Sequence, residues 1–391
     1  MRPLNLMDGI VDNANFVYVT KEVANKNGLK IYPKWTLVIS RVGIYVRFGV
    51  VTDYEQFVIS SNAIAIVPKH KSVSKFLAIY LRTKYGNLQL YRNQQYSSQP
   101  KISTSFISDM KIPEIKGFYV DVAKVYDAAL ESLKKSELEY ANAEQLLLEE
   151  LGLNNFNPST EPVAVKNFSQ SFGASGRLDA EYYQSKYEDY EVALNTAHKL
   201  AELCDIHDSA IVPHSSDYKY IELSDIGASG NITGCTIAPF KELPSRARRL
   251  VKSGQLIVSS IEGSLTSCAL VTDDYDGAIC STGFYVVNST KMNSETLLVL
   301  FKSEPIQQLM KKRCSGTILT AISKVTLETM PFPLIDKDTQ SEIAEMVQKS
   351  FALRRQSEEL LERAKRAVEI AIENGEDEAI NFLESAKVCG Y

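Results

Sequence analysis

The chain has 391 residues, of which 45% are hydrophobic and 23% charged, and this length suits two or three folded domains. No apolar run reaches the roughly 18 residues that a membrane span needs, and the opening sequence MRPLNLMDGIVDNANF lacks the apolar stretch of a signal peptide. We therefore expect a cytoplasmic protein. The six cysteines form no CxxC pair and the four histidines no i, i+4 pair, so we expect no zinc site, no disulfide framework and no cofactor.

The net charge of −5 is unevenly distributed along the chain. Residues 1–115 hold 15 Lys and Arg against 7 Asp and Glu, whereas residues 116–160 hold 4 against 8 and residues 336–391 hold 8 against 13. Because binding to nucleic acid needs local positive potential, the basic first segment remains compatible with such binding although the whole chain is acidic.

The first segment predicts a mixed α+β domain over residues 1–115. Short β-type runs at 36–40, 48–52 and 57–67 are broken by Gly, Asn, Asp and Ser. A helical pattern follows over 72–93, and the segment ends in ISTSFISDMKIPEI at 102–115.

Residues 119–151 predict a long amphipathic helix that ends at Gly152, and we assign residues 116–154 to this first coil helix. Its apolar stripe has a period of 3.5 residues and consists of Tyr126, Leu130, Leu133, Tyr140, Leu147 and Leu151. A polar linker rich in Pro, Gly and Ser follows at 155–176.

The second half repeats this order. A domain over 177–335 contains β-type runs at 255–260, 268–272 and 278–288 and a helical pattern at 294–313. A second coil helix follows at 336–375, with an apolar stripe rich in Ala and Ser that permits close approach of a partner helix, and residues 376–391 form a C-terminal tail.

The two halves align at an offset of 220 residues over about one hundred positions, without a gap. Ile102-Ser103 falls on Ile322-Ser323, and Val51-Thr52-Asp53 falls on Val271-Thr272-Asp273. A sequence pattern that occurs twice at a constant offset predicts a structural duplication. About 45 residues from 177 onward have no counterpart before Met1, so we expect the first domain to be N-terminally short.

Known catalytic motifs are missing from the sequence. A DNA adenine methyltransferase needs a Gly-rich cofactor loop and an Asn/Asp-Pro-Pro-aromatic motif, but Asn157-Pro158 is followed by Ser159. No GxxxxGK[ST] phosphate loop occurs either. We therefore expect a protein that is not an enzyme.

The order of motifs resembles the specificity (S) subunit of type I restriction-modification enzymes. The resemblance rests on RLDAEYY at 177–183, a Gly-bearing β turn, Ser-Gly-Thr at 315–317, Ile-Ser at 322–323, MPFP at 330–333 and TQSEIAEMV at 339–347. It covers nearly the whole chain. It implies an α+β fold in which two mixed α/β target-recognition domains are separated by two long antiparallel helices that form a coiled coil.

The resemblance also implies function and partners. Each recognition domain would read one half of a split double-stranded DNA target, and two methyltransferase (M) subunits would dock on the helices. The restriction/translocase (R) subunit would be reached through them, although the sequence leaves its presence open. Such a subunit is a non-catalytic part of a phage-defence system.

Candidate DNA contacts lie where basic, amide and aromatic residues collect on predicted turns, because Arg, Asn and Gln read base edges while Lys and hydroxyl groups hold phosphates. In the first domain they are Arg41, Tyr45, Arg47, Arg92, Gln94, Gln95, Tyr96, Ser98, Gln99 and Lys101. In the second they are Arg246, Arg248, Arg249, Lys252, Ser260, Glu262, Ser264, Lys312, Arg313 and Thr317.

The alternative is a protein-interaction scaffold without a DNA role, whose coils oligomerise. The basic first segment argues against it. Residues 211–335 carry almost no net charge, with 12 basic against 11 acidic side chains, and this leaves the scaffold alternative open.

Overall fold

The computed structural model describes residues 1–11, 16–92, 100–115, 117–208, 210–211, 217–316 and 320–385. The chain divides into two compact units: unit 1 comprises Met1–Lys134 and Leu353–Tyr391, and unit 2 comprises Lys135–Ala352. No helix among the described residues combines the length and the apolar character needed to cross a membrane.

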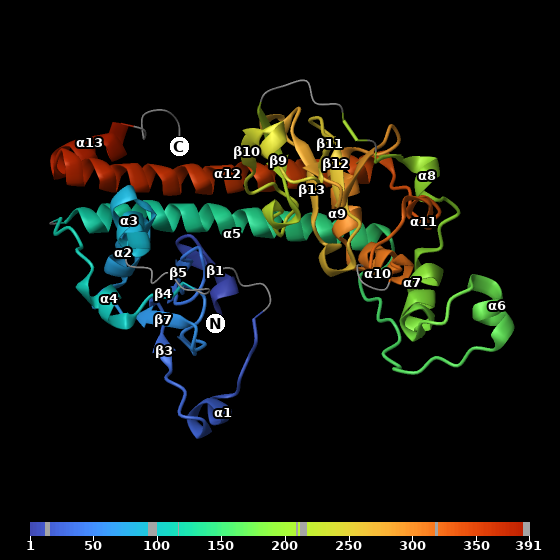
Figure 1. The fold of residues 1–391 in the computed structure, drawn as a ribbon, viewed down its shortest axis with the longest axis horizontal. Helices are drawn as coiled ribbons and strands as arrows, with labels where there is room; N and C mark the ends of the chain where they lie inside the picture. Colours follow the sequence, from blue (N-terminus) through green and yellow to red (C-terminus); the bar gives the residue numbers. More distant parts are fainter. Residues whose placement is uncertain are drawn as a thin grey trace. The chain divides into compact units, whose positions relative to one another are not determined.

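Unit 1 is built on a three-stranded antiparallel sheet in the order β5-β4-β7. Helix α2 packs against strands β4 and β5 of this sheet, and α3 packs against α2 (Figure 1). The strands of the unit are β1 (Leu6–Met7), β2 (Ile10–Val11), β3 (Tyr32–Pro33), β4 (Leu37–Ser40), β5 (Phe48–Val50), β6 (Gln56–Phe57) and β7 (Ala63–Ile66). Its helices are α1 (Lys21–Lys26), α2 (Lys71–Arg82), α3 (Lys84–Arg92), α4 (Thr104–Asp109) and α13 (Glu376–Ser385), with the first part of α5 (Phe118–Glu150) and the last part of α12 (Lys337–Glu373).

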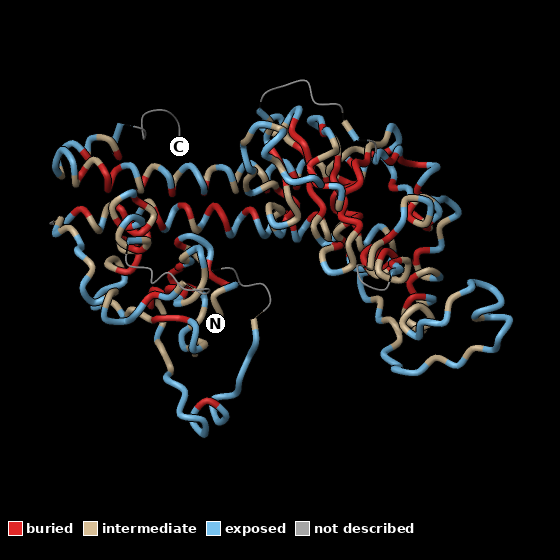
Figure 2. The backbone as a smooth tube through the Cα atoms, in the orientation of Figure 1, coloured by how far each residue is buried: buried red, intermediate tan, exposed pale blue. Residues whose placement is uncertain are grey.

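The core of unit 1 joins this sheet to the long helices. All four residues of β4 are buried. Figure 2 shows buried residues in red along the sheet and along one side of the long helices. Tyr126 of α5 is fully buried, and its hydroxyl donates a hydrogen bond of 2.8 Å to the carbonyl of Gly9. The small residues Ala364 and Ala367 of α12 are fully buried in the same cluster, as the predicted stripe of small residues requires.

Helix α13 occupies most of the segment that we expected to be a tail. Ala379 and Leu383 are buried in the unit 1 core, and Arg363 of α12 donates to the carbonyl of Leu383. The segment therefore folds back along α12.

Unit 2 contains two four-stranded sheets, in the orders β10-β9-β14-β11 and β13-β12-β15-β8. Its strands are β8 (Asp205–His207), β9 (Asp217–Ile221), β10 (Thr236–Pro239), β11 (Ala247–Leu250), β12 (Leu256–Ser259), β13 (Cys268–Leu270), β14 (Ile279–Ser281) and β15 (Phe284–Asn288). Its helices are α6 (Phe172–Ser175), α7 (Ser185–Leu194), α8 (Leu200–Leu203), α9 (Ser294–Lys302), α10 (Glu304–Arg313) and α11 (Lys324–Glu328), with the remaining parts of α5 and α12.

The structure confirms the mixed α and β content and the two long helices, which are antiparallel within each unit. In unit 1, Ser132 of α5 donates to Gln356 of α12 over 3.3 Å. In unit 2 the hydroxyls of Ser136 and Ser350 lie 3.1 Å apart, and Lys349 pairs with Glu139 at 2.6 Å. Residues later in α5 thus meet residues earlier in α12.

The two units share the central strands, but the expected gapless register is wrong. The offset is 219 between β4 and β12, 220 between β5 and β13, and 221 between β7 and β15. The reason is that the connections 260–267 and 271–283 of unit 2 are each one residue longer than 41–47 and 51–62 of unit 1. Only the β-sheet pairing shows these insertions.

The repeated Ile-Ser motif has the same role in both units. Ile102 and Ile322 are each 1% exposed. Ser103 and Ser323 cap α4 and α11, since each side chain accepts a hydrogen bond of 3.2 Å from the backbone N–H three residues later. The motif therefore anchors the chain in the core and then starts a short helix.

Candidate nucleic-acid interface

In unit 1 the loop 41–47, between β4 and β5, is held against the segment that follows α3. The N–H of Ile102 donates to the carbonyl of Arg41 (2.9 Å), and the N–H of Gly43 donates to that of Pro100 (3.1 Å). Gly43 has a φ of 131°, which residues with a Cβ rarely adopt. The loop 41–47 and residues 100–102, which are far apart in sequence, are thus neighbours.

Exposed cations surround this junction. Arg41, Arg47, Arg92 and Lys101 are all exposed, and within the described part of the chain no ion pair involves any of them. Tyr45 at the tip of the loop is 75% exposed. The predicted residues Gln94, Gln95, Tyr96, Ser98 and Gln99 lie outside the described residues.

Unit 2 builds the same junction with different side chains. The N–H of Ile322 donates to the carbonyl of Ser260 (2.9 Å), and the N–H of Glu262 donates to that of Thr320 (3.0 Å). By strand register Arg41 corresponds to Ser260 and Gly43 to Glu262. The backbone scaffold is therefore duplicated, whereas the loop of unit 2 carries no Arg at these places.

The hydroxyl groups of the unit 2 loop are used within the protein. Ser260, a predicted DNA contact, is 6% exposed, and its hydroxyl donates to the carbonyl of Gly283 over 2.9 Å. Ser264 is half-buried and lies 3.2 Å from the hydroxyl of Ser259. Glu262 is half-buried. Thr317 lies outside the described residues.

Lys312 and Arg313, also predicted DNA contacts, form ion pairs within unit 2. At the end of α10 they donate to the two carboxylate oxygens of Glu191 in α7, each over 2.8 Å, and their side chains are only 11% and 14% exposed. Burial alone would raise the pKa of Glu191, but the hydrogen bonds from the two cations lower it below its ordinary value. This ion triad fixes α7 on α10 and withdraws both cations from solvent.

The four basic residues predicted around β11 differ in their surroundings. Arg246 is exposed and pairs with Glu222 at 2.8 Å. Arg248 donates to the carbonyl of Ser245. Lys252 is exposed in the turn before β12, at the opposite end of that strand from Ser260.

Arg249 is the unusual member of this group. Its guanidinium lies 5.1 Å from the centre of the Tyr285 ring, and its Nε and Nη1 atoms are buried without a hydrogen-bond partner. The hydroxyl of Tyr285 in turn donates to the carbonyl of Ile322. Arg249 is half-buried, and two of its guanidinium nitrogens have no hydrogen-bond partner among the described residues, beside the tyrosine that bonds to Ile322 at the junction.

The residues that position the end of α10 were not among the predicted site residues. Arg177, in the RLDAEYY motif, forms paired hydrogen bonds with Asp179 (2.8 and 2.6 Å) and donates to the carbonyl of Cys314 (2.9 Å). The hydrogen bond from Arg177 lowers the pKa of Asp179. The motif was visible in the sequence, but its contact lies 137 residues away and left no local signal.

Comparisons with known proteins give similar folds only. No family model and none of the curated proteins matches the chain. A chain from a study of complex assembly and conformational transition of the type I R-M system is 14% identical, with a TM-score of 0.31 over 98% of this chain and 90% of its own. The type I restriction-modification S subunit from M. genitalium is 13% identical, with a TM-score of 0.34 over 91% and 84%. The HsdS subunit from Thermoanaerobacter tengcongensis is 13% identical, with a TM-score of 0.30 over 96% and 90%.

Proposed function

We propose that the chain is a non-catalytic DNA-recognition subunit of a type I restriction-modification complex. Each unit reads one half of a split double-stranded target, and two methyltransferase subunits dock on the helices. The protein works in the cytoplasm, with a restriction subunit joining through the methyltransferases.

The observation that carries this proposal is the duplicated loop junction. In both units the loop after the central strand clamps the segment that follows the second short helix, through the same two backbone hydrogen bonds. A repeated scaffold with different side chains suits two modules that read different sequences, because base readout depends on side chains and positioning on backbone and phosphate contacts.

The charge of the junctions supports a nucleic-acid partner. Arg41, Arg47, Arg92 and Lys101 are exposed and make no ion pair with the described residues, so they supply the local positive potential that phosphate contacts require. Unit 2 contributes Arg246, Arg248 and the half-buried Arg249. The scaffold alternative does not explain why exposed cations gather at the junction of unit 1.

The long helices suit a spacing role. Both α5 and α12 continue from one unit into the other, since the division between units falls inside each helix. A helix of 33 residues rises about 50 Å at 1.5 Å per residue, which exceeds the roughly 34 Å of one DNA turn. We infer that the helix pair sets the distance between the two half-sites.

The direct test is DNA retention by the chain co-purified with its methyltransferase partner, measured at several salt concentrations. The proposal predicts that the complex prefers DNA with a split motif. It also predicts that the logarithm of the DNA association constant falls linearly with the logarithm of the salt concentration. Methyltransferase binding without any DNA preference beyond that of the methyltransferase alone would support the scaffold alternative.

A further inference from the structure

The loop 41–47 of unit 1 carries two large apolar side chains at its tip. Ile44 is 68% exposed and Tyr45 is 75% exposed. Single exposed apolar residues are ordinary on a protein surface, but adjacent ones on one loop tip expose a joint apolar surface, which is typical of interaction sites. The tip of this loop is therefore a candidate contact surface.

The loop holds this tip away from the core of the unit. The N–H of Ser40 donates to the carbonyl of Arg47 (2.7 Å), and the N–H of Arg47 donates to the hydroxyl of Ser40 (2.8 Å). These two bonds close the base of the loop, and Val46 packs against the core cluster of the unit. The tip is thus presented in a defined conformation, so that little conformational entropy is lost when a partner binds it.

The corresponding loop of unit 2 buries its apolar residue instead. Residues Glu262–Ser264 form a short 3₁₀ turn, and the next residue, Leu265, is 5% exposed and belongs to the core of unit 2. Residues 260–267, all of which the structure describes, include no exposed large apolar side chain. The same backbone junction therefore presents an apolar tip in unit 1 and a polar one in unit 2.

Cations lie on both sides of the apolar tip. Arg41 and Arg47 stand at the two ends of the loop, and Lys101 lies beside it, since an antiparallel bridge joins Lys101 to Val42. All three cations are exposed. Duplex DNA offers the complementary arrangement, because its stacked bases are bordered by rows of phosphates.

An apolar side chain that inserts between two base pairs unstacks them and kinks the duplex. An aromatic side chain also stacks on the base that is uncovered. Ile44 and Tyr45 together supply both kinds of contact. Pyrimidine–purine steps are flexible and unstack most easily, so a loop that inserts in this way selects sequence through the deformability of DNA.

We propose that the loop 41–47 is a wedge that inserts Ile44 and Tyr45 between adjacent base pairs of the half-site read by unit 1, while Arg41 and Lys101 hold neighbouring phosphates. The preferred substrate is duplex DNA with a pyrimidine–purine step at the point of insertion. This inference rests on the proposed function and adds to it a kink in one half-site only, because the loop of unit 2 buries Leu265.

The test uses the chain co-purified with its methyltransferase and duplex DNA that carries the split motif. The fluorescent base 2-aminopurine replaces one adenine of either strand at a time, and its fluorescence rises when the base loses a stacking partner. The adenine that becomes methylated is left unmodified, because the methyltransferase itself flips that base.

We expect a several-fold rise in fluorescence on binding, at one step of one half-site. Tyr45→Ala should abolish this rise and weaken DNA binding about tenfold, because the stacking of one aromatic ring on a base is lost. Tyr45→Phe should retain both the rise and the affinity, since the ring remains.

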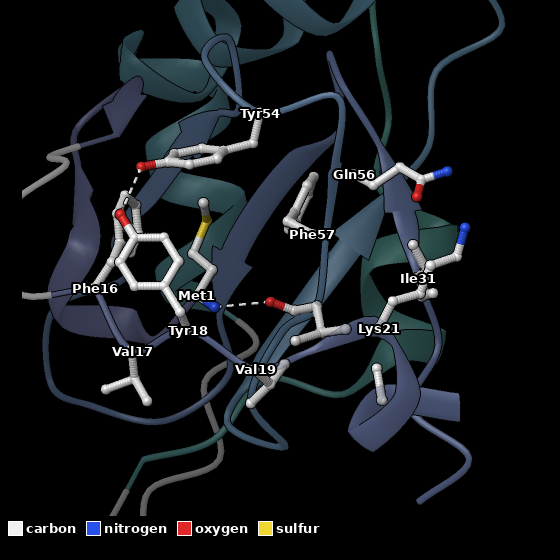
Figure 3. A pocket seen from close by; sticks show the side chains of 12 residues that line it. Met1, Phe16, Val17, Tyr18, Val19, Lys21, Ile31, Tyr54, Gln56 and Phe57 are labelled. Atoms are coloured by element: carbon white, nitrogen blue, oxygen red, sulfur yellow. Dashed lines mark hydrogen bonds between the residues drawn. The ribbon is translucent and has the colours of Figure 1, made fainter. Parts of the chain in front are cut away.

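Tyr18 provides the matched control, because it has the same exposed fraction of 75% in the same unit. It lines a cavity of about 240 Å³ together with Tyr54 and Phe57, and the Tyr18 and Tyr54 hydroxyls lie 3.3 Å apart (Figure 3). Tyr18→Ala should leave the fluorescence rise and the DNA affinity unchanged.

Binding of the split motif without a fluorescence rise at any position would overturn the wedge and leave the proposed function standing. A rise that persists in Tyr45→Ala would also overturn it, because the DNA would then be unstacked by another part of the complex. A complex without preference for a split motif would overturn the proposed function itself. Retention on phosphatidylglycerol vesicles that is lost in Tyr45→Ala, with DNA binding unchanged, would assign the tip to a membrane surface instead.

Discussion

The loop of unit 1 brings its functional side chains together through backbone geometry. Arg41 and Arg47 flank the loop, and Gly43 supplies the turn that reaches Pro100. These side chains are exposed and have no ion-pair partner among the described residues. Under the proposed function, contact with a DNA phosphate would therefore break no ion pair that the described residues make.

Replacing Arg47 with Ala should weaken binding of the split target about tenfold, because the loss of an Arg contact to a base costs about 1–3 kcal/mol and about 1.4 kcal/mol corresponds to a tenfold change in affinity. The measurement is fluorescence anisotropy of the complex with labelled DNA. Lys26→Ala, which removes an equal charge from the exposed last turn of α1, is the control. An equal effect of the two substitutions would mean that only net charge matters.

Arg249 permits a sharper test, since its Nε and Nη1 atoms are buried without partners. Arg249→Met should leave the free energy of unfolding within about 1 kcal/mol of the wild-type value, because no hydrogen bond to these atoms is lost, and yet weaken DNA binding. Denaturant unfolding and anisotropy measure the two effects. A large loss of stability would show that the guanidinium is a structural element instead.

At the scale of elements, α7 depends on its ion triad with α10. Glu191→Gln should destabilise unit 2 by about 3 kcal/mol near neutral pH, because two largely buried cations lose their counter-charge. The folded-state pKa of Glu191 lies below its unfolded value, so this stabilisation is complete above the ordinary pKa of Glu and is lost as the pH falls through the folded-state value. The free energies of unfolding of wild type and variant should therefore converge between pH 7 and pH 3. A difference that stays constant over this range would show that the charge of Glu191 does not stabilise unit 2.

Two buried serines, one from each long helix, are in contact in unit 2. Ser136 and Ser350 are each 0% exposed and hydrogen bonded to one another. Ser350→Leu should cost about 1–3 kcal/mol, because no space exists for the larger side chain. Ser341→Leu on the exposed side of α12 is the matched control, and thermal unfolding distinguishes them. Equal stability of the two variants would show that the helices do not approach closely there.

Sequence periodicity predicted the elements well, and their long-range contacts poorly. The strands around 37–40 and 256–259 and both coil helices follow from apolar patterns and the repeat. The partners of Lys312 and Arg313 could not be predicted, because Glu191 is more than 120 residues away. One-residue insertions in two loops were hidden by chance matches such as Gly43 with Gly263.

At the scale of the whole molecule, the proposed spacing role can be tested by shortening both long helices. Deleting one heptad from each, residues 135–141 of α5 and 346–352 of α12, preserves the apolar register and removes about 10 Å of helix. The preferred spacer should then shorten by about three base pairs at 3.4 Å each, while the half-site sequences stay the same. Methylation of a randomised DNA library measures the spacer length and the half-site sequences together. Altered half-sites with an unchanged spacer would contradict the proposed spacing role of the long helices.

The central claim is that this chain selects a split DNA sequence for methylation. Methylome sequencing of the host with and without the gene measures this directly. We predict one adenine-methylated motif, made of two short sequences at a fixed spacing, that disappears when the gene is deleted. Identical methylomes, with the partner methyltransferase expressed in both strains, would contradict the account.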